Sequence, residues 1–167
     1  MINYNIEEMK ESDLEEVLKI YLEGINTGIA TFQNSIPTFD NWNNDHIKSC
    51  RLVAKFDGKV LGFIALSPTS SRCVYSGVAE ISIYIGEKYR GLRIGTALMT
   101  NMIKLSEENN FWTLQSGIIK ENVASIELHK KCGFREIGIR ENIAKMDDGA
   151  WHDTVLMERR SKSVGIN

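Results

Sequence analysis

The sequence from Val78 to Thr96 is V-A-E-I-S-I-Y-I-G-E-K-Y-R-G-L-R-I-G-T, and our prediction of the fold is based on this stretch. Its first half alternates and is rich in β-branched and aromatic residues, which predicts a strand. Its second half is a turn containing Gly91 and Gly95, and apolar residues then recur at helical spacing from Ile94. The first amides of a helix lack partners within it and carry the positive end of its dipole. The stretch therefore predicts a strand, a phosphate cradle and a helix in succession.

The composition predicts one ordinary globular domain over residues 1–167. The chain is 43% hydrophobic and 25% charged, and its length suits one core better than two. Its net charge of −2 offers no electrostatic footprint for nucleic acid or an anionic membrane. No stretch has the pattern of a secretion signal or a membrane span, so we expect neither. Cys50, Cys73 and Cys132 are widely spaced, which favours reduced thiols in a cytoplasmic protein over a disulfide framework or a metal site.

The remaining chain alternates between strand and helix signals. Ser12 with Glu15 predicts a capping box at the start of the first helix, and further helices are expected after Pro37 and Asn122. Strand patterns cover residues 4–9, 51–56, 59–66, 111–119, 134–140 and 150–157. The resulting order, β-α-α-β-β-β-α-β-α-β-β, predicts an α+β fold.

The central turn resembles the Q/R-x-x-G-x-G/A pyrophosphate loop of the GNAT family, the acetyl-CoA-dependent N-acetyltransferases. Arg90 and Gly95 match its first and last positions, whereas Arg93 stands where the family most often has glycine. Taken alone, the turn also fits an ordinary connection between a strand and a helix. The order of elements is also that of the GNAT family, and a block from Asn122 to Phe134 resembles a later GNAT motif. The resemblance implies a mixed central sheet flanked by helices and acetyl-CoA as co-substrate. Since no His, Cys or Asp cluster has the spacing of a ligand set, we expect no metal.

Four short features resemble the phosphinothricin N-acetyltransferase subgroup, which acetylates the amine of small amino-acid-like compounds. They are Ala30-Thr31-Phe32 with Pro37, Arg72-x-x-Tyr75, Glu80-x-Ser82-x-Tyr84 and Trp151-His152-Asp153. Dimers are common in this subgroup, so the resemblance implies a homodimer, with the strand of Trp151 as a possible interface.

The resemblance also implies where acetyl-CoA binds. Backbone groups of a strand segment would pair with pantetheine like an added strand, the turn would hold the pyrophosphate, and Asn122 would bond to the pantetheine arm. The residues expected at this site are Ile83, Tyr84, Ile85, Arg90, Gly91, Leu92, Arg93, Ile94, Gly95, Thr96 and Asn122.

Glu80 is the candidate general base. An amine attacks a thioester only as the free base, and a carboxylate in a partly desolvated cleft can have its pKa raised toward the working range. A glutamate among apolar neighbours on the central strand fits this role, and the resemblance places the base here. It would act directly or through a water. Alternatively, Glu80 faces solvent with Ser82 and Tyr84 on the polar side of an amphipathic strand.

His129 stands where GNAT enzymes commonly have a tyrosine, four residues before Gly-Phe. A histidine there could donate a proton to the departing thiolate or make an orienting hydrogen bond. It could also be a helix histidine without a catalytic role.

A small amino-acid substrate carries a carboxylate, which an arginine fork with a neutral donor would bind. Arg72 with Tyr75 is the candidate pair, and Thr31 with Phe32 would close over the substrate side chain. Arg72 could equally be a surface arginine on a loop.

The leading hypothesis is therefore an enzyme that acetylates the primary amine of a small molecule by direct attack in a ternary complex. One alternative is acetylation of a protein N-terminus or lysine. Another is a regulatory module that binds acetyl-CoA without turnover, which would need the phosphate cradle but not Glu80.

Overall fold

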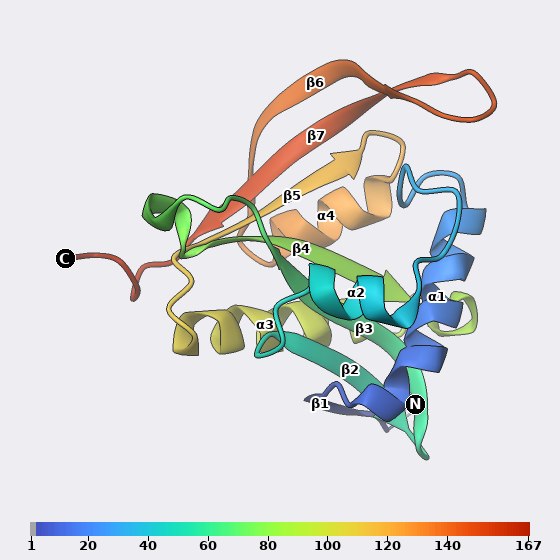
Figure 1. Ribbon diagram of the computed structural model, residues 1–167, viewed down its shortest axis with the longest axis horizontal. Coiled ribbons are helices and arrows are strands. Elements are labelled where there is room, and N and C mark those ends of the chain that lie inside the picture. Colours follow the sequence, from blue (N-terminus) through green and yellow to red (C-terminus); the bar gives the residue numbers. More distant parts are fainter. Residues whose placement is uncertain (1–2) are drawn as a thin grey trace.

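The computed structural model describes residues 3–167, and its elements follow the predicted order β-α-α-β-β-β-α-β-α-β-β (Figure 1). The strands are β1 (Asn5–Glu8), β2 (Arg51–Phe56), β3 (Lys59–Pro68), β4 (Val78–Ile85), β5 (Thr113–Ile119), β6 (Arg135–Lys145) and β7 (Trp151–Arg160). The helices are α1 (Leu14–Asn26), α2 (Phe39–Asp45), α3 (Ile94–Glu108) and α4 (Val123–Lys131). Short 3₁₀ turns occupy Glu11–Asp13, Cys73–Tyr75 and Glu87–Tyr89.

The strands form one mixed sheet in the order β1-β2-β3-β4-β5-β7-β6, which confirms the predicted α+β class. All neighbours are antiparallel except β4 and β5, which run parallel. This parallel pair is short: it joins only Val78 to Thr113, Ala79 to Leu114 and Glu80 to Gln115. Beyond Glu80 the two strands diverge, and a wedge opens in the middle of the sheet (Figure 1). The same sheet takes strands from near both ends of the described residues, β1 and β7.

Two apolar clusters cover opposite faces of the sheet. On one face, α1 and Trp42 of α2 pack against Phe63 and Ala65 of β3. On the other face, α3 packs against Ile64 and Leu66 of the same strand. Because β3 is buried on both faces, its sequence is a nearly continuous apolar run rather than an alternating one.

The start of α1 differs from the prediction. Asp13, not Ser12, holds the turn before the helix, because its carboxylate accepts the backbone N–H of Lys10 at 2.8 Å. The other carboxylate oxygen of Asp13 lies 2.6 Å from Nζ of Lys55 on β2. This buried ion pair ties the start of α1 to the sheet, a long-range contact that the local capping pattern could not reveal. Within residues 3–167, no helix is long and apolar enough to cross a membrane.

Candidate active site

Two adjoining cavities occupy the wedge between β4 and β5. The first has a volume of about 500 Å³ and the second about 490 Å³. They share the residues Ala30, Ile83, Tyr84, Asn122 and Ser125, so they are two ends of one cleft. We call the first end the acceptor cavity and the second the cofactor cavity, for reasons given below.

The cofactor cavity collects nearly all of the residues predicted to bind acetyl-CoA. Of these, Leu92 is the exception: its side chain is 42% exposed and does not line the cavity. The predicted residues that do line it are Ile83, Tyr84, Ile85, Arg90, Gly91, Arg93, Ile94, Gly95, Thr96 and Asn122.

The turn before α3 has the backbone geometry of an anion cradle. Gly91 and Arg93 both have left-handed φ angles, of +78° and +63°. Arg93 is the N-cap residue of α3 and caps it with no side-chain hydrogen bond, so the first amides of the helix remain free for a ligand. Gly95 has a different role, because a Cβ atom there would lie 3.1 Å from Cδ2 of Leu128 on α4. The second glycine thus permits close packing of α3 on α4.

The cofactor cavity also offers hydrogen-bonding groups along its length. Beyond Glu80, the backbone groups that β4 directs toward β5 have no strand partner in residues 3–167, because the ladder ends there. Asn122 caps α4 by accepting the backbone N–H of Ser125 through Oδ1 at 3.3 Å. Its amide hydrogens stay available to the cleft.

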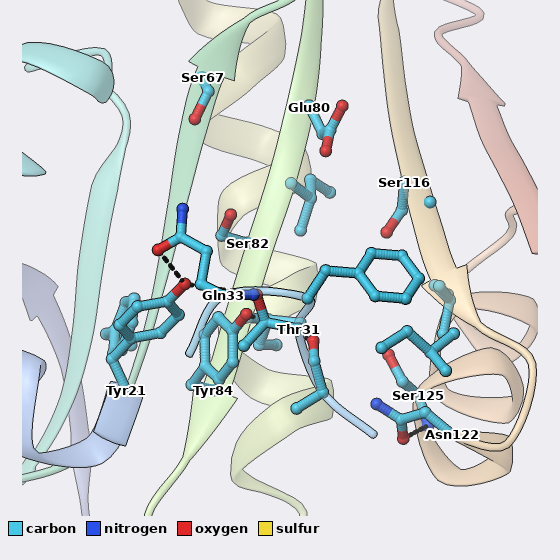
Figure 2. A pocket seen from close by; sticks show the side chains of 18 of the residues that line it. Tyr21, Thr31, Gln33, Ser67, Glu80, Ser82, Tyr84, Ser116, Asn122 and Ser125 are labelled. Atoms are coloured by element: carbon cyan, nitrogen blue, oxygen red, sulfur yellow. Dashed lines mark hydrogen bonds between the residues drawn. The ribbon is translucent and has the colours of Figure 1, made fainter. Parts of the chain in front are cut away.

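The acceptor cavity is lined mainly by neutral polar side chains from several elements (Figure 2). Glu80 and Ser82 project from β4, and Ser67 lies directly across from Glu80 on β3. The predicted residues Thr31 and Phe32 also line this cavity. Glu80 is solvent-exposed, so the chain alone does not provide the desolvation that we expected for it. Bound substrates would have to provide it.

A tyrosine pair forms one wall of the acceptor cavity. The rings of Tyr21 on α1 and Tyr84 on β4 meet edge to face at 4.9 Å, and Tyr84 stacks on Phe63 at 5.4 Å. The Tyr21 hydroxyl donates to Oε1 of Gln33 at 2.8 Å. Burial raises the pKa of both tyrosines, so both phenols stay protonated and can donate hydrogen bonds at neutral pH.

His129 lies on the floor of the acceptor cavity with only 1% of its surface exposed. Its Nδ1 lies 2.7 Å from the carbonyl oxygen of Ser125, which can only accept, so Nδ1 carries the proton. Burial lowers the pKa of this imidazole, which keeps it neutral. The buried Nε2 is then a hydrogen-bond acceptor, and it has no partner in the described chain.

Arg72 and Tyr75, the predicted carboxylate site, lie outside both cavities. Arg72 directly precedes the exposed 3₁₀ turn before β4 and Tyr75 is its last residue, and the Arg72 guanidinium lies 5.8 Å from the centre of the Tyr75 ring. This contact is a cation–π interaction at the surface. The two side chains are in contact, but neither lines the cavity wall.

Other predicted chemistry can also be located. None of the three cysteines lines either cavity, and Cys50 is buried whereas Cys73 is exposed. Among the described residues, no group of three or more His, Cys, Asp or Glu side chains could hold a metal ion.

Sequence reasoning did not assign Tyr21, Gln33, Ser116 or His46 to the cavity, although all four line it. Tyr21 lies on the face of α1 that packs in the apolar cluster with Phe63. A tyrosine on such a face still needs a partner for its hydroxyl, and that requirement was the available signal.

Comparison with known proteins identifies the family of this chain. Residues 14–134 match the acetyltransferase (GNAT) family model. The chain belongs to the GNAT family. It is accordingly an acetyl-CoA-dependent N-acetyltransferase, as the resemblance implied.

Similar proteins include a phosphinothricin N-acetyltransferase from Alcaligenes faecalis, which is 30% identical and covers 90% of this chain and 79% of its own length. An L-methionine sulfoximine/L-methionine sulfone acetyltransferase from Pseudomonas aeruginosa is 23% identical over 88% of both chains.

Solved structures agree on the fold. A ribosomal-protein-alanine N-acetyltransferase from Brucella melitensis superimposes with a TM-score of 0.86 at 27% identity, over 94% of this chain and 99% of the other. A phosphinothricin acetyltransferase from Sinorhizobium meliloti, solved with acetyl-CoA, gives 0.87 at 24% identity over 99% and 92%.

The cofactor cavity suits acetyl-CoA on its own geometry. Free amides at the start of α3 would hold the pyrophosphate, and the unpaired edge of β4 would hold the pantetheine amides. When bound, this co-substrate supplies the activated acetyl group as a thioester.

Proposed function

We propose that this protein acetylates the primary amine of a small amino-acid-like substrate, such as phosphinothricin, methionine sulfoximine or a natural amino acid. The observation that carries the proposal is the place of Glu80. It lines the acceptor cavity at the last residue where β4 and β5 still pair, on the strand whose residues Ile83 and Tyr84 line both cavities. A carboxylate there can take a proton from an amine facing the cofactor cavity.

The reaction would proceed by direct attack in a ternary complex. Glu80 accepts a proton from the substrate ammonium, directly or through a water, and the free amine attacks the acetyl carbonyl. A backbone amide at the unpaired edge of β4 would polarise that carbonyl. Direct attack needs no acyl-enzyme, in keeping with the position of the three cysteines outside both cavities.

His129 would orient a hydrogen-bond donor and would not release a proton. Its Nδ1–H is held by the Ser125 carbonyl, so Nε2 offers a lone pair toward the acceptor cavity. A water bound to Nε2 could donate its other hydrogen to the departing thiolate. This role fits the imidazole of His129, which is neutral at neutral pH.

Arg72 and Tyr75 would anchor the substrate carboxylate. They stand on the turn that leads into β4, eight and five residues before Glu80. Since neither residue lines the cavity, the turn Cys73–Tyr75 would have to move toward it when the substrate binds.

Acetylation of a protein N-terminus is the second candidate function. It is favoured by the likeness to the ribosomal-protein-alanine N-acetyltransferase, which is 27% identical. A peptide N-terminus has no free carboxylate beside its amine, and the described lining of the acceptor cavity includes no Lys or Arg.

We also propose a homodimer formed through the β6–β7 hairpin. Four large apolar side chains are exposed there, namely Ile137, Ile139, Ile143 and Trp151. An exposed apolar patch on an edge strand favours association. Light scattering should give twice the monomer mass, and Ile139→Lys should reduce the measured mass to that of the monomer.

We further propose a cytoplasmic location, which the three free thiols support.

The experiment that tests the proposed function measures CoA release at neutral pH from acetyl-CoA with a panel of amines. The panel holds phosphinothricin, methionine sulfoximine, the common amino acids, a polyamine and a short peptide. Turnover confined to small compounds with an acid group beside the amine is the expected result. Turnover with the peptide alone would favour the second candidate, and tight acetyl-CoA binding without any turnover would indicate a regulatory module.

A further inference from the structure

We propose that Gln33, held by Tyr21, recognises the side chain of the substrate and selects an uncharged oxygen acceptor over an anionic one. The group selected is the oxygen of a sulfone, sulfoximine or amide, and the group rejected is a phosphinate or a second carboxylate. This inference rests on the proposed function and narrows its substrate class.

The orientation of the Gln33 amide is fixed by its partners. The Tyr21 hydroxyl donates to Oε1 of Gln33 at 2.8 Å, and the backbone N–H of Gln33 donates to Oγ1 of Thr31 at 3.2 Å. With its oxygen occupied, the amide directs its nitrogen away from Tyr21 and into the cavity, on the side where Ser67 and Ser82 project (Figure 2). Within residues 3–167, no acceptor is found for that nitrogen. Gln33 therefore presents two N–H donors to a ligand.

Tyr21 is a rigid support for this amide. Its ring is buried on α1 and packs edge to face on Tyr84, which itself stacks on Phe63. The raised pKa of Tyr21 keeps its hydroxyl protonated, so this hydroxyl can serve as the donor that orients Gln33 at neutral pH. The hydroxyl also lies 3.4 Å from Oγ1 of Thr31, which closes a small network.

The charges around the acceptor cavity disfavour an anionic side chain. The formally charged residues in its described lining are Asp45 and Glu80, both negative. The two histidines there, His46 and His129, have pKa values lowered by burial and are neutral at neutral pH. With Arg72 paired to the α-carboxylate that both compounds carry, a phosphinate would add a third negative charge, and no lysine or arginine in this lining would balance it. A sulfone oxygen accepts the Gln33 hydrogens without that repulsion.

A purely structural role for Gln33 is the competing explanation, because it lies in the loop between α1 and α2. That loop has a separate attachment, in which Nδ2 of Asn34 donates to Oδ2 of Asp147 at 2.8 Å. Asn34 does not line the acceptor cavity. The variant Asn34→Ala is therefore a matched control that weakens the loop without touching the proposed recognition site.

The test is kcat/KM for L-methionine sulfone and for phosphinothricin, measured with the full-length protein and its variants. We expect the wild type to favour the sulfone. Gln33→Ala should lower kcat/KM for the sulfone about tenfold, the loss of roughly one hydrogen bond, and change that for phosphinothricin less. Gln33→Lys should shift the preference toward phosphinothricin. Tyr21→Phe should reproduce part of the Gln33→Ala effect, and Asn34→Ala should change both substrates by the same factor.

Two results would overturn this inference. One is a wild-type preference for phosphinothricin, and the other is an equal loss for both substrates in Gln33→Ala. If no amine releases CoA, the proposed function has failed instead. Calorimetric titration of the two compounds into the CoA-bound protein then still measures the selection, and equal or reversed affinities refute it.

Discussion

The two ends of the cleft are built in different ways. The cofactor cavity takes more than half of its lining residues from one stretch, Ile83 to Thr96, and the rest from α1, the loop after it, and α4 with its cap Asn122. The acceptor cavity is made of side chains that come from α1, the loop after it, α2, β3, β4, β5 and α4. Backbone amides tolerate sequence changes that side-chain sites do not, so a family can keep one co-substrate while its acceptor changes. The following four predictions test this contrast.

Replacement of Glu80 should have the largest effect and should separate the two cavities. Glu80→Gln keeps the size of the side chain but removes the base, so we expect kcat/KM to fall about 10²- to 10⁴-fold. The affinity for acetyl-CoA, measured by calorimetry, should not change, because Glu80 lines only the acceptor cavity. Glu108→Gln on the exposed end of α3 is the control. Full activity in Glu80→Gln would remove this residue from the mechanism.

A branched side chain at position 95 should damage the other end of the cleft, whereas a single methyl group should not. A Cβ atom at this position would lie 3.1 Å from the flexible tip of Leu128, which can move slightly, so Gly95→Ala should be tolerated. Gly95→Val adds two methyl groups, and overpacking of about 1–3 kcal/mol should weaken acetyl-CoA binding roughly tenfold or more. Urea unfolding of both variants shows how much of the loss comes from stability. Unchanged affinity in Gly95→Val would contradict close packing of α3 on α4.

The pH dependence of stability should report the buried imidazole of His129. Its pKa in the folded state is lowered by burial, whereas the unfolded chain titrates near 6.5. As the pH falls through that value, the unfolded state binds the extra proton, so the free energy of unfolding decreases. Urea unfolding at pH 7.5 and 5.5 should show a decrease larger by about 1 kcal/mol in the wild type than in His129→Gln. His46 contributes with the same sign in both proteins. Equal slopes would mean that His129 is not held neutral.

The smallest effect is expected at Arg93, where the backbone and not the side chain forms the cradle. The left-handed φ of Arg93 costs an L-residue about 1–2 kcal/mol, and glycine would remove this strain. Glycine also loses more conformational entropy on folding, which offsets part of the stability gained. Arg93→Gly should therefore change the unfolding free energy by less than about 1 kcal/mol. Acetyl-CoA affinity should fall by less than about fivefold, since one exposed charge contributes little. A much larger loss would assign phosphate binding to the guanidinium.

Local patterns predicted some features of the site and missed others for identifiable reasons. Residues Arg90 to Thr96 were predicted because strand, turn and helix follow each other directly, and their hydrogen bonds join near neighbours. The prediction that Ser12 caps the first helix was wrong, because Asp13 holds this turn and forms an ion pair with Lys55, 42 positions later in the chain. Arg72 was expected beside the substrate, yet the exposed turn that carries it lies outside the cavity.

The α+β order and the family could be predicted from the amino-acid sequence, because they depend on periodicity and on motifs within continuous stretches. The set of side chains that meet in the acceptor cavity depends on the three-dimensional arrangement of seven separate segments, and no local pattern predicts it. The wedge exists because β4 and β5 stop pairing after Glu80, a fact of strand geometry with no local signal. The proton of His129 and the orientation of the Gln33 amide depend on partners that the fold supplies, since each hydrogen bond fixes which atom can donate.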